Sequence, residues 1–301
     1  MSPLSTRPPI LAVFTKNRVN PAYDAARLAV ERAAAQAGAR TVHYVTATPD
    51  HVGEQKALVA EALAARPDAV LFNPTDDVAM AEDVARITAA GIPVGVFINR
   101  MNVPVVTFVG SDDVRVGETI ARALFQGLGG TGKVVALDGT PGARTARDRT
   151  EGLKRALAEN PGIELVGSRV GYLQEVPARA AMAELLRDHP RIDGVWTAND
   201  VMAFGALKAL EEAGRTATVV GINGLPAAID HIERGTMLAS VDFSAFNIAS
   251  IAAQAVLRHL AGQPVPAEIM VPAELIDRSN CHRWKVPFER RPIPNWADFV
   301  R

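Results

Sequence analysis

The feature that most constrains the fold of this chain is a regular alternation of short apolar runs with longer amphipathic segments, which continues from residue 10 to about residue 260. The apolar runs are rich in Val, Ile, Leu and Phe and are bounded by turn-forming residues, a pattern typical of strands buried on both faces. The longer segments repeat apolar residues at helical spacing. This alternation predicts parallel sheets covered by helices on both faces.

The alternation gives a set of predicted elements. We predict strands at residues 10–15, 41–45, 69–72, 93–98, 105–109, 133–137, 164–170, 194–197, 218–222 and 239–241. We predict helices between residues 21 and 38 and at 53–65, 77–90, 114–128, 146–159, 178–189, 201–213, 227–234 and 248–260. Glycine follows many of these helices, where a helix end favours a residue that can adopt left-handed backbone angles.

The number of predicted strands is too large for one comfortable sheet, so we expect two similar lobes. Residues 109–113 are a candidate crossing between them, because the two strands before this point have no helix between them. After Leu275 the alternation is replaced by a Pro-, Arg- and Trp-containing segment. Because this tail carries aromatic residues, we expect it to pack on a lobe rather than to be disordered.

Composition excludes several classes of function. The chain has 301 residues, 48% hydrophobic and 22% charged, and a formal net charge of −1, which opposes a basic nucleic-acid footprint. Cys281 is the one cysteine, so no internal disulfide is possible. The histidines are scattered, and no nucleophile motif or paired acid and base is visible, so we predict no metal, no cofactor and no enzymatic activity. No apolar run approaches the roughly 20 residues of a membrane span.

Asparagine, arginine and aromatic residues recur where the predicted strands end. Ligands of open parallel sheets bind at the carboxyl ends of the strands. Amides, guanidinium groups and aromatic faces suit a polyhydroxyl ligand, although each asparagine alone could equally cap a helix. Recurrence in both lobes favours ligand binding for the set. The candidates are Asn20, Tyr23, Asn99, Arg100, Arg147, Tyr172, Asn199, Asn223 and Phe243.

Several of these segments together resemble the type I periplasmic sugar-binding proteins, the ribose- and galactose-binding class. The resemblance extends in order from about Ile10 to Leu275. Its most specific parts are Ala146-Arg147-Asp148-Arg149-Thr150-Glu151-Gly152 and Ala198-Asn199-Asp200-Val201-Met202-Ala203-Phe204-Gly205-Ala206. Less specific parts are Asn20-Pro21-Ala22-Tyr23, Phe72-Asn73-Pro74-Thr75-Asp76, Asn99-Arg100 and Val220-Gly221-Ile222-Asn223-Gly224.

The resemblance implies two doubly wound lobes joined by a three-segment hinge, with the ligand between them. The lobes would be residues 1–110 with 244–271, and residues 111–243 with 272–301. Asn20, Tyr23, Asn99 and Arg100 would contact ligand from the first lobe. Arg147, Tyr172, Asn199 and Asn223 would act from the second, and Phe243 would face the cleft from a hinge position.

The function implied is that of the solute-binding protein of an ABC-type importer, which captures a sugar, sugar alcohol or sugar acid. The partners would be membrane permease subunits, and we expect a monomer. The location would be periplasmic, although residues 1–9 contain no export signal. The alternative is the effector-sensing domain of a LacI-like transcription regulator, but the residues before Ile10 are too few for a DNA-binding headpiece.

Two departures from the family pattern concern ligand charge. Asn99 and Asn223 stand where the family commonly has Asp, while Arg100 and Arg147 are retained. Fewer carboxylates facing two arginines would favour an anionic ligand such as a sugar acid, because charges interact strongly in a partly desolvated cleft. A neutral polyol or deoxy sugar is the alternative, favoured by Phe243 and Ala22.

Overall fold

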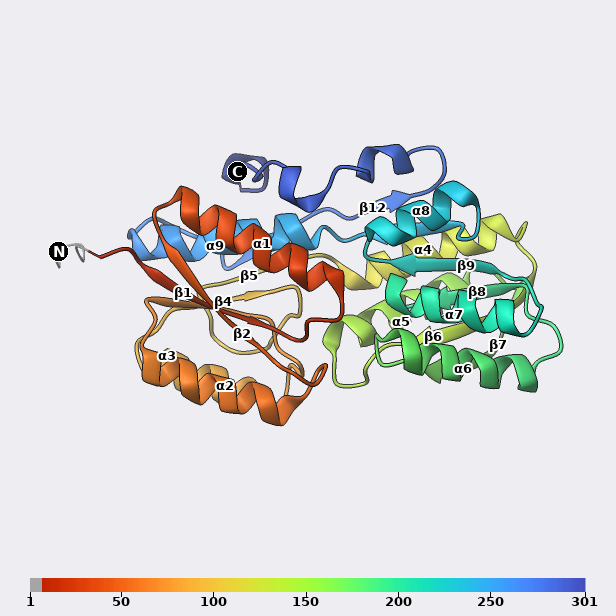
Figure 1. Cartoon of the computed structure of the whole chain (residues 1–301), viewed down its shortest axis with the longest axis horizontal. Helices are drawn as coiled ribbons and strands as arrows, with labels where there is room; N and C mark the ends of the chain where they lie inside the picture. Colours follow the sequence, from red (N-terminus) through yellow and green to blue (C-terminus); the bar gives the residue numbers. More distant parts are fainter. Residues whose placement is uncertain (1–6, 301) are drawn as a thin grey trace. The chain divides into compact units, whose positions relative to one another are not determined.

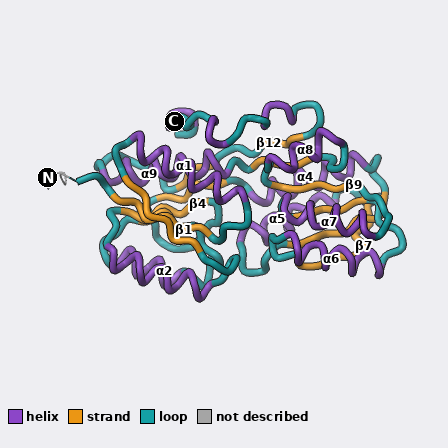
Figure 2. Tube along the Cα trace, in the orientation of Figure 1, coloured by secondary structure: helices purple, strands orange, loops and turns teal. Residues whose placement is uncertain are grey.

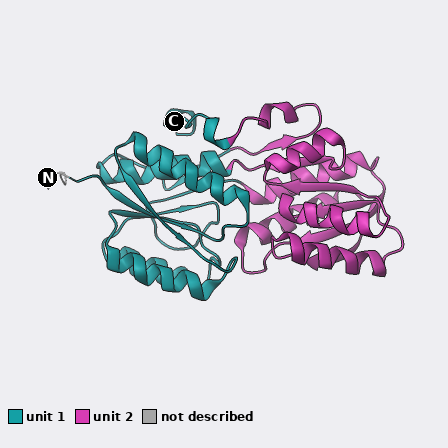
Figure 3. Cartoon of the chain, viewed as in Figure 1, with its two compact units in different colours: residues 1–111, 245–271, 288–301 teal, residues 112–244, 272–287 magenta. Residues whose placement is uncertain are grey.

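The structure, a computed structural model, describes residues 7–300 of the chain. Residues 1–6, where the sequence predicts no export signal, lie outside the described residues. The chain divides into two compact units (Figure 3). Unit 1 comprises residues 1–111, 245–271 and 288–301, and unit 2 comprises residues 112–244 and 272–287.

Unit 1 is a six-stranded parallel sheet with helices on both faces (Figure 1). Its strands, in spatial order, are β11 (Glu268–Met270), β5 (Thr107–Gly110), β4 (Val94–Phe97), β3 (Ala69–Phe72), β1 (Ile10–Thr15) and β2 (Arg40–Val45). The helices α1 (Pro21–Gln36) and α9 (Ala245–Leu260) pack together on one face, and α2 (Val52–Ala65) and α3 (Ala81–Ala89) cover the other. The central strands β3 and β4 are buried throughout, as expected for strands covered on both sides.

Unit 2 repeats this architecture, and Figure 2 shows the same alternation of strand and helix in it. Its strands, in spatial order, are β12 (Glu274–Ile276), β10 (Ala239–Asp242), β9 (Thr218–Ile222), β8 (Gly194–Thr197), β6 (Gly132–Asp138) and β7 (Ile163–Val170). All pairs are parallel except β10 with β12. The helices are α4 (Asp113–Gly127), α5 (Arg144–Ala158), α6 (Glu175–Asp188), α7 (Asp200–Glu212) and α8 (Pro226–Arg234).

Two glycines allow α4 and α5 to approach very closely in unit 2. A Cβ atom added at Gly152 would lie 2.0 Å from the carbonyl oxygen of Val114, and one added at Gly117 would lie 2.1 Å from that of Arg149. Both contacts are with backbone atoms, which cannot move aside as a flexible side chain can. The close approach of these helices therefore depends on the absence of a side chain at both positions.

The prediction of two doubly wound parallel-sheet lobes is confirmed, and most predicted elements are found within a few residues. Helix α3 begins at Ala81 rather than at residue 77, because Asp76 Oδ1 accepts hydrogen bonds from the backbone N–H groups of Val78 and Ala79 and holds a turn there. The short strands β11 and β12 were not predicted. Each has three residues, too few for a periodic pattern to be recognised.

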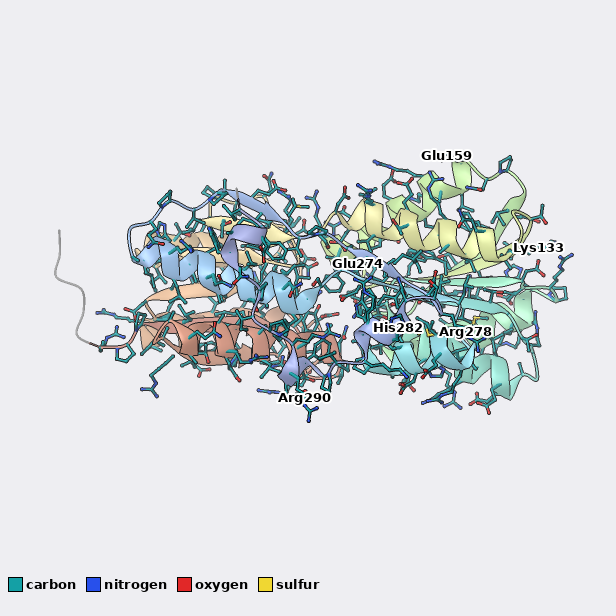
Figure 4. All side chains as sticks on the ribbon, turned by 90° about the horizontal axis from the view of Figure 1, so that it is seen from above. Lys133, Glu159, Glu274, Arg278, His282 and Arg290 are labelled. Atoms are coloured by element: carbon teal, nitrogen blue, oxygen red, sulfur yellow. The ribbon has the colours of Figure 1, made fainter. Side chains whose placement is uncertain are left out.

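The tail departs from the prediction that residues 272–301 belong wholly to the second lobe. Residues 272–287 pack with unit 2, where the 3₁₀ helix η1 (Cys281–Trp284), which contains His282, lies against α8 (Figure 4). Residues 288–301, which contain η2 (Phe288–Arg290) and η3 (Trp296–Asp298), pack with unit 1.

Specific contacts explain why the last part of the tail belongs to unit 1. Arg32 of α1 donates hydrogen bonds to the carbonyl oxygens of Phe288 and Arg291. The guanidinium of Arg258 lies 4.6 Å from the ring centroid of Trp296. The chain therefore passes from unit 2 to unit 1 once more after Pro287, in addition to the passages after Ser111, Ser244 and Val271.

Candidate ligand-binding site

The strand orders place the same topological switch point in both units. In unit 1 the order reverses between β1 and β3, and in unit 2 it reverses between β6 and β8. The loops that follow such a strand pair diverge to opposite faces of the sheet and leave a crevice at its carboxyl edge, which is where doubly wound proteins bind ligands. Candidate side chains should therefore follow these strands and their neighbours.

In unit 1 two candidates follow β1. Asn20 is buried and caps α1, since its Oδ1 accepts a hydrogen bond from the backbone N–H of Ala22 at 3.0 Å. Tyr23 lies in the first turn of the same helix and is 7% exposed. The capping role considered for the asparagines is thus real at Asn20, and it fixes the side chain at the edge where a ligand would be bound.

Two further candidates of unit 1 follow β4. The Nδ2 of Asn99 donates to Asn73 Oδ1 at 2.9 Å, which joins the loops after β4 and β3 through two buried amides. Arg100 is held differently. Its guanidinium pairs with Glu268 of β11 and lies 4.3 Å from the ring centroid of Phe108. Arg100 is therefore neutralised within its own unit.

In unit 2 the candidate Asn199 caps α7 and links two loops. Its Oδ1 accepts from the backbone N–H of Met202 at 2.8 Å, and its Nδ2 donates to the carbonyl oxygen of Leu173 at 3.0 Å. The second bond reaches the loop that carries Tyr172, whose side chain is 50% exposed. Arg147, on the first turn of α5, donates to the carbonyl oxygen of Pro141 at 3.2 Å.

The remaining candidates, Asn223 and Phe243, follow β9 and β10 and are buried. The backbone N–H of Asn223 donates to the carbonyl oxygen of Val241 at 2.8 Å, so the ends of these neighbouring strands are held together. Each unit therefore carries its candidates at the carboxyl edge of its own sheet.

Strained backbone coincides with these strand ends. Positive φ angles occur at Ile98 (62°), Tyr172 (56°), Asn223 (138°) and Ser244 (66°). Ile98 directly precedes Asn99, and Ser244 directly follows Phe243. For a β-branched residue such as Ile98 this conformation is especially unfavourable, and strain of this kind is retained mainly where function requires a particular geometry.

Sequence reasoning missed Arg149, which lies two residues after Arg147 on α5. Its side chain is buried and forms an ion pair with Asp113, with Nε 2.8 Å from Oδ1. Its Nη1 donates to the carbonyl oxygen of Ala198 at 2.9 Å, and its guanidinium carbon lies 5.0 Å from the ring centroid of Phe243. The sequence did contain a signal for this residue, because the motif at residues 146–152 has a second arginine after Arg147.

Two buried carboxyl groups of unit 2 have raised pKa values. Burial raises the pKa of Asp113 to about 6, although the neighbouring Arg149 opposes the shift. Burial raises the pKa of Asp200 to about 7, opposed by hydrogen bonds from the Leu225 N–H and the Ser240 hydroxyl. Desolvation disfavours the charged form in both cases.

Two further observations concern the described part of the chain, residues 7–300. No group of three or more His, Cys, Asp or Glu side chains in it is arranged to hold a metal ion. None of its helices is long and apolar enough to cross a membrane.

Comparison with known proteins supports the resemblance to periplasmic binding proteins that was seen in the sequence. Residues 11–264 match the family described as periplasmic binding protein domain. The ribose import binding protein of Bacillus subtilis is 30% identical over 267 residues, which cover 88% of this chain and 85% of that protein. The D-ribose/D-allose-binding protein of Pseudomonas aeruginosa is 30% identical over 236 residues, which cover 73% of this chain and 72% of that protein.

A solved structure agrees over a similar extent. An ABC transporter periplasmic solute binding protein from Actinobacillus succinogenes with bound D-allose superimposes with a TM-score of 0.87 at 27% identity. The match covers 91% of this chain and 99% of that chain.

The fold and these matches together define the class of this chain as that of the periplasmic binding proteins. The chain belongs to the periplasmic binding protein domain family. The resemblance seen in the sequence is thereby confirmed, and the importer function is supported over the LacI-like alternative. Members of this family are substrate-binding transport proteins rather than enzymes.

Proposed function

We propose that this protein captures a neutral polyhydroxyl solute, a sugar or a polyol, in the periplasm and delivers it chemically unchanged to the permease subunits of an ABC importer. The observation that supports this most is the recurrence of buried amide side chains at the carboxyl edges of both sheets, at Asn20, Asn99, Asn199 and Asn223. An amide both donates and accepts hydrogen bonds, as does every sugar hydroxyl. Amide side chains can therefore satisfy the hydroxyl groups of a ligand that carries no net charge.

The preference for a neutral ligand comes from the ion pairs. The sequence favoured an anionic ligand because Arg100 and Arg147 are retained while Asn99 and Asn223 stand where the family commonly has Asp. In the structure Arg100 pairs with Glu268, and three other cations of these segments are paired as well, Lys16 with Asp50, Arg144 with Asp148 and Arg149 with Asp113. An anionic ligand would gain less from cations that are already neutralised.

Capture would proceed by closure of the two units on the solute about the chain crossings after Ser111, Ser244 and Val271. The polar side chains of both carboxyl edges would contact one ligand, as the resemblance implies for all nine candidates. We expect the protein to act as a monomer, with one ligand per chain. X-ray scattering should show a smaller radius of gyration in the presence of saturating ligand.

The primary test is a thermal-shift screen of pentoses, hexoses, polyols and sugar acids, because a ligand that binds only the folded state raises the melting temperature. Calorimetry with the best compound should give one site per chain. The compound should be recovered unchanged after prolonged incubation. Conversion at enzyme-like rates, or no response to any polyhydroxyl compound, would contradict the proposal.

Ligand charge is tested separately. The affinity for a sugar acid is compared with the affinity for its neutral parent at two salt concentrations. We expect the neutral parent to bind more tightly, with little dependence on salt. Tighter binding of the acid that weakens as salt is added would restore the anionic alternative, because salt screens exposed charges.

A further inference from the structure

The indole of Trp284, in the C-terminal tail, forms a hydrogen bond with the end of β10. Its Nε1–H donates to Asp242 Oδ2 at 2.8 Å, and both residues are buried. The other carboxylate oxygen, Asp242 Oδ1, accepts from the backbone N–H of Ser244 at 2.6 Å and closes a turn around Phe243. Trp284 belongs to η1, which lies outside residues 11–264, the part of the chain that matches the family model.

From these bonds we infer that Trp284 is a positioning residue, which orients Asp242 and through it holds the turn that carries Phe243. Ser244 has a φ angle of 66°, which is unfavourable for a residue with a side chain. An aspartate that accepts the N–H two residues later stabilises such a turn. The indole donor binds the second oxygen of the same carboxylate and so fixes its orientation. This inference rests on the proposed function of Phe243 as a ligand contact.

The side chain of Asp242 also borders the loop that carries Asn223. Gly224, which follows Asn223, has a φ angle of 63°, and a Cβ atom added there would lie 2.8 Å from the Cβ of Asp242. The backbone N–H of Asn223 donates to the carbonyl oxygen of Val241, directly before Asp242. A different orientation of Asp242 would therefore alter the packing of both strand-end loops.

The alternative is that Trp284 only anchors the tail to unit 2. Other contacts already hold this segment, since η1 packs against α8 and its Cys281 is buried. The Nζ of Lys285 also lies 2.6 and 2.8 Å from the two carboxylate oxygens of Glu233 on α8. Because these contacts hold η1 without the indole N–H, the hydrogen bond to Asp242 is better explained by the orientation it gives to that carboxylate.

The experiment is amide hydrogen exchange of the unliganded protein, measured residue by residue by NMR. Trp284→Phe keeps an aromatic ring and removes the donor, and the Ser244 amide reports on the orientation of Asp242. We expect this amide to exchange at least about tenfold faster in Trp284→Phe than in the parent, while the amides of β9 change little, because the opening is local. Lys285→Met removes an ion pair of the same tail segment and should leave Ser244 protected as in the parent.

A double variant distinguishes positioning through Asp242 from general support of the fold. Asp242→Ala removes the acceptor of the Ser244 amide, which should therefore exchange faster. If Trp284 acts through Asp242, Trp284→Phe/Asp242→Ala should exchange no faster at Ser244 than Asp242→Ala alone. Parent-like protection of Ser244 in Trp284→Phe, or additive increases in the double variant, would overturn the inference. If Asp242→Ala does not fold, the comparison of Trp284→Phe with Lys285→Met decides alone.

Sugar affinity measures the consequence for binding. With the sugar that gives the largest thermal shift, Trp284→Phe should bind roughly threefold to tenfold more weakly, because the Phe243 ring would pack less well against it. Lys285→Met should bind as the parent does. Faster exchange at Ser244 with unchanged affinity would also overturn the inference. Because the exchange experiment contains no sugar, its failure is distinct from failure of the proposed function, which the thermal-shift screen decides.

Discussion

The hydroxyl of Ser240 donates a hydrogen bond to the buried carboxylate of Asp200 at 2.7 Å and joins β10 to the start of α7. The second oxygen of Asp200 accepts from the backbone N–H of Leu225 at 2.9 Å. Asp200 thus connects the loop after β9, which carries Asn223, to the helix that Asn199 caps. This carboxylate holds two candidate ligand loops in place.

The first prediction concerns pH. Burial raises the pKa of Asp200 from its usual value of 3.8 to about 7, so between these values the folded state binds more protons than the unfolded state. Its contribution to stability should therefore fall as pH rises from about 4 to about 7. Asp200→Asn should flatten the pH dependence of the unfolding free energy, measured by urea denaturation across this range. Asp230→Asn, at an exposed site on α8, should not, and an unchanged slope in Asp200→Asn would contradict the assignment.

The second prediction concerns Arg147. Arg147→Ala should weaken solute binding by about 2–4 kcal/mol, because charged hydrogen bonds are lost and ligand groups remain unpaired. Calorimetry with the sugar that gives the largest thermal shift measures this. Arg155→Ala is the control, since Arg155 lies on the same helix but pairs with Glu151 on an exposed face. Equal affinity of the two variants would remove Arg147 from the site.

The third prediction concerns the contact between α4 and α5. Gly152→Ala should destabilise the protein by about 1–3 kcal/mol or more, because the new methyl group would meet the Val114 carbonyl oxygen. Gly53→Ala makes the same change in a helix where the nearest atom to the new methyl group is Cε1 of the His51 side chain at 3.1 Å, so it should cost much less stability than Gly152→Ala, since a side chain can move aside more easily than backbone. The free energies come from denaturant unfolding. If Gly152→Ala loses no more stability than Gly53→Ala, the helices α4 and α5 can move apart at little cost and the prediction is wrong.

The fourth prediction concerns the end of the tail. Arg32→Ala removes two hydrogen bonds to carbonyl oxygens of residues 288 and 291 and a guanidinium 5.7 Å from the Phe246 ring centroid. Trypsin should then cleave after Arg290 about tenfold faster or more, because two hydrogen bonds of about 1 kcal/mol each no longer oppose opening. Mass spectrometry follows the released peptide. Arg40→Ala, at an exposed position of β2, is expected to behave as the parent, and the same rate in both variants would be evidence against anchoring by Arg32.

The amino-acid sequence by itself determined the strands, the helices and their grouping into two similar lobes. Hydrophobic periodicity, glycines at helix C-termini and helix-capping residues are local features of a few consecutive positions, so they can be recognised in the sequence alone. Asn20 and Asn199 illustrate this, because each caps the helix that begins at the next residue. The position of candidates at strand ends follows from the same local pattern.

Only the tertiary structure decided which charges are paired and where the tail lies. Arg100 meets Glu268 across 168 positions of sequence, and Arg149 meets Asp113 across 36. Such pairs depend on strand order and on how closely two helices approach, and neither is encoded in a local pattern. The tail divides between units for the same reason, since Arg32 and Arg258 become neighbours of residues 288–296 only after α1 and α9 have packed on one face of the sheet.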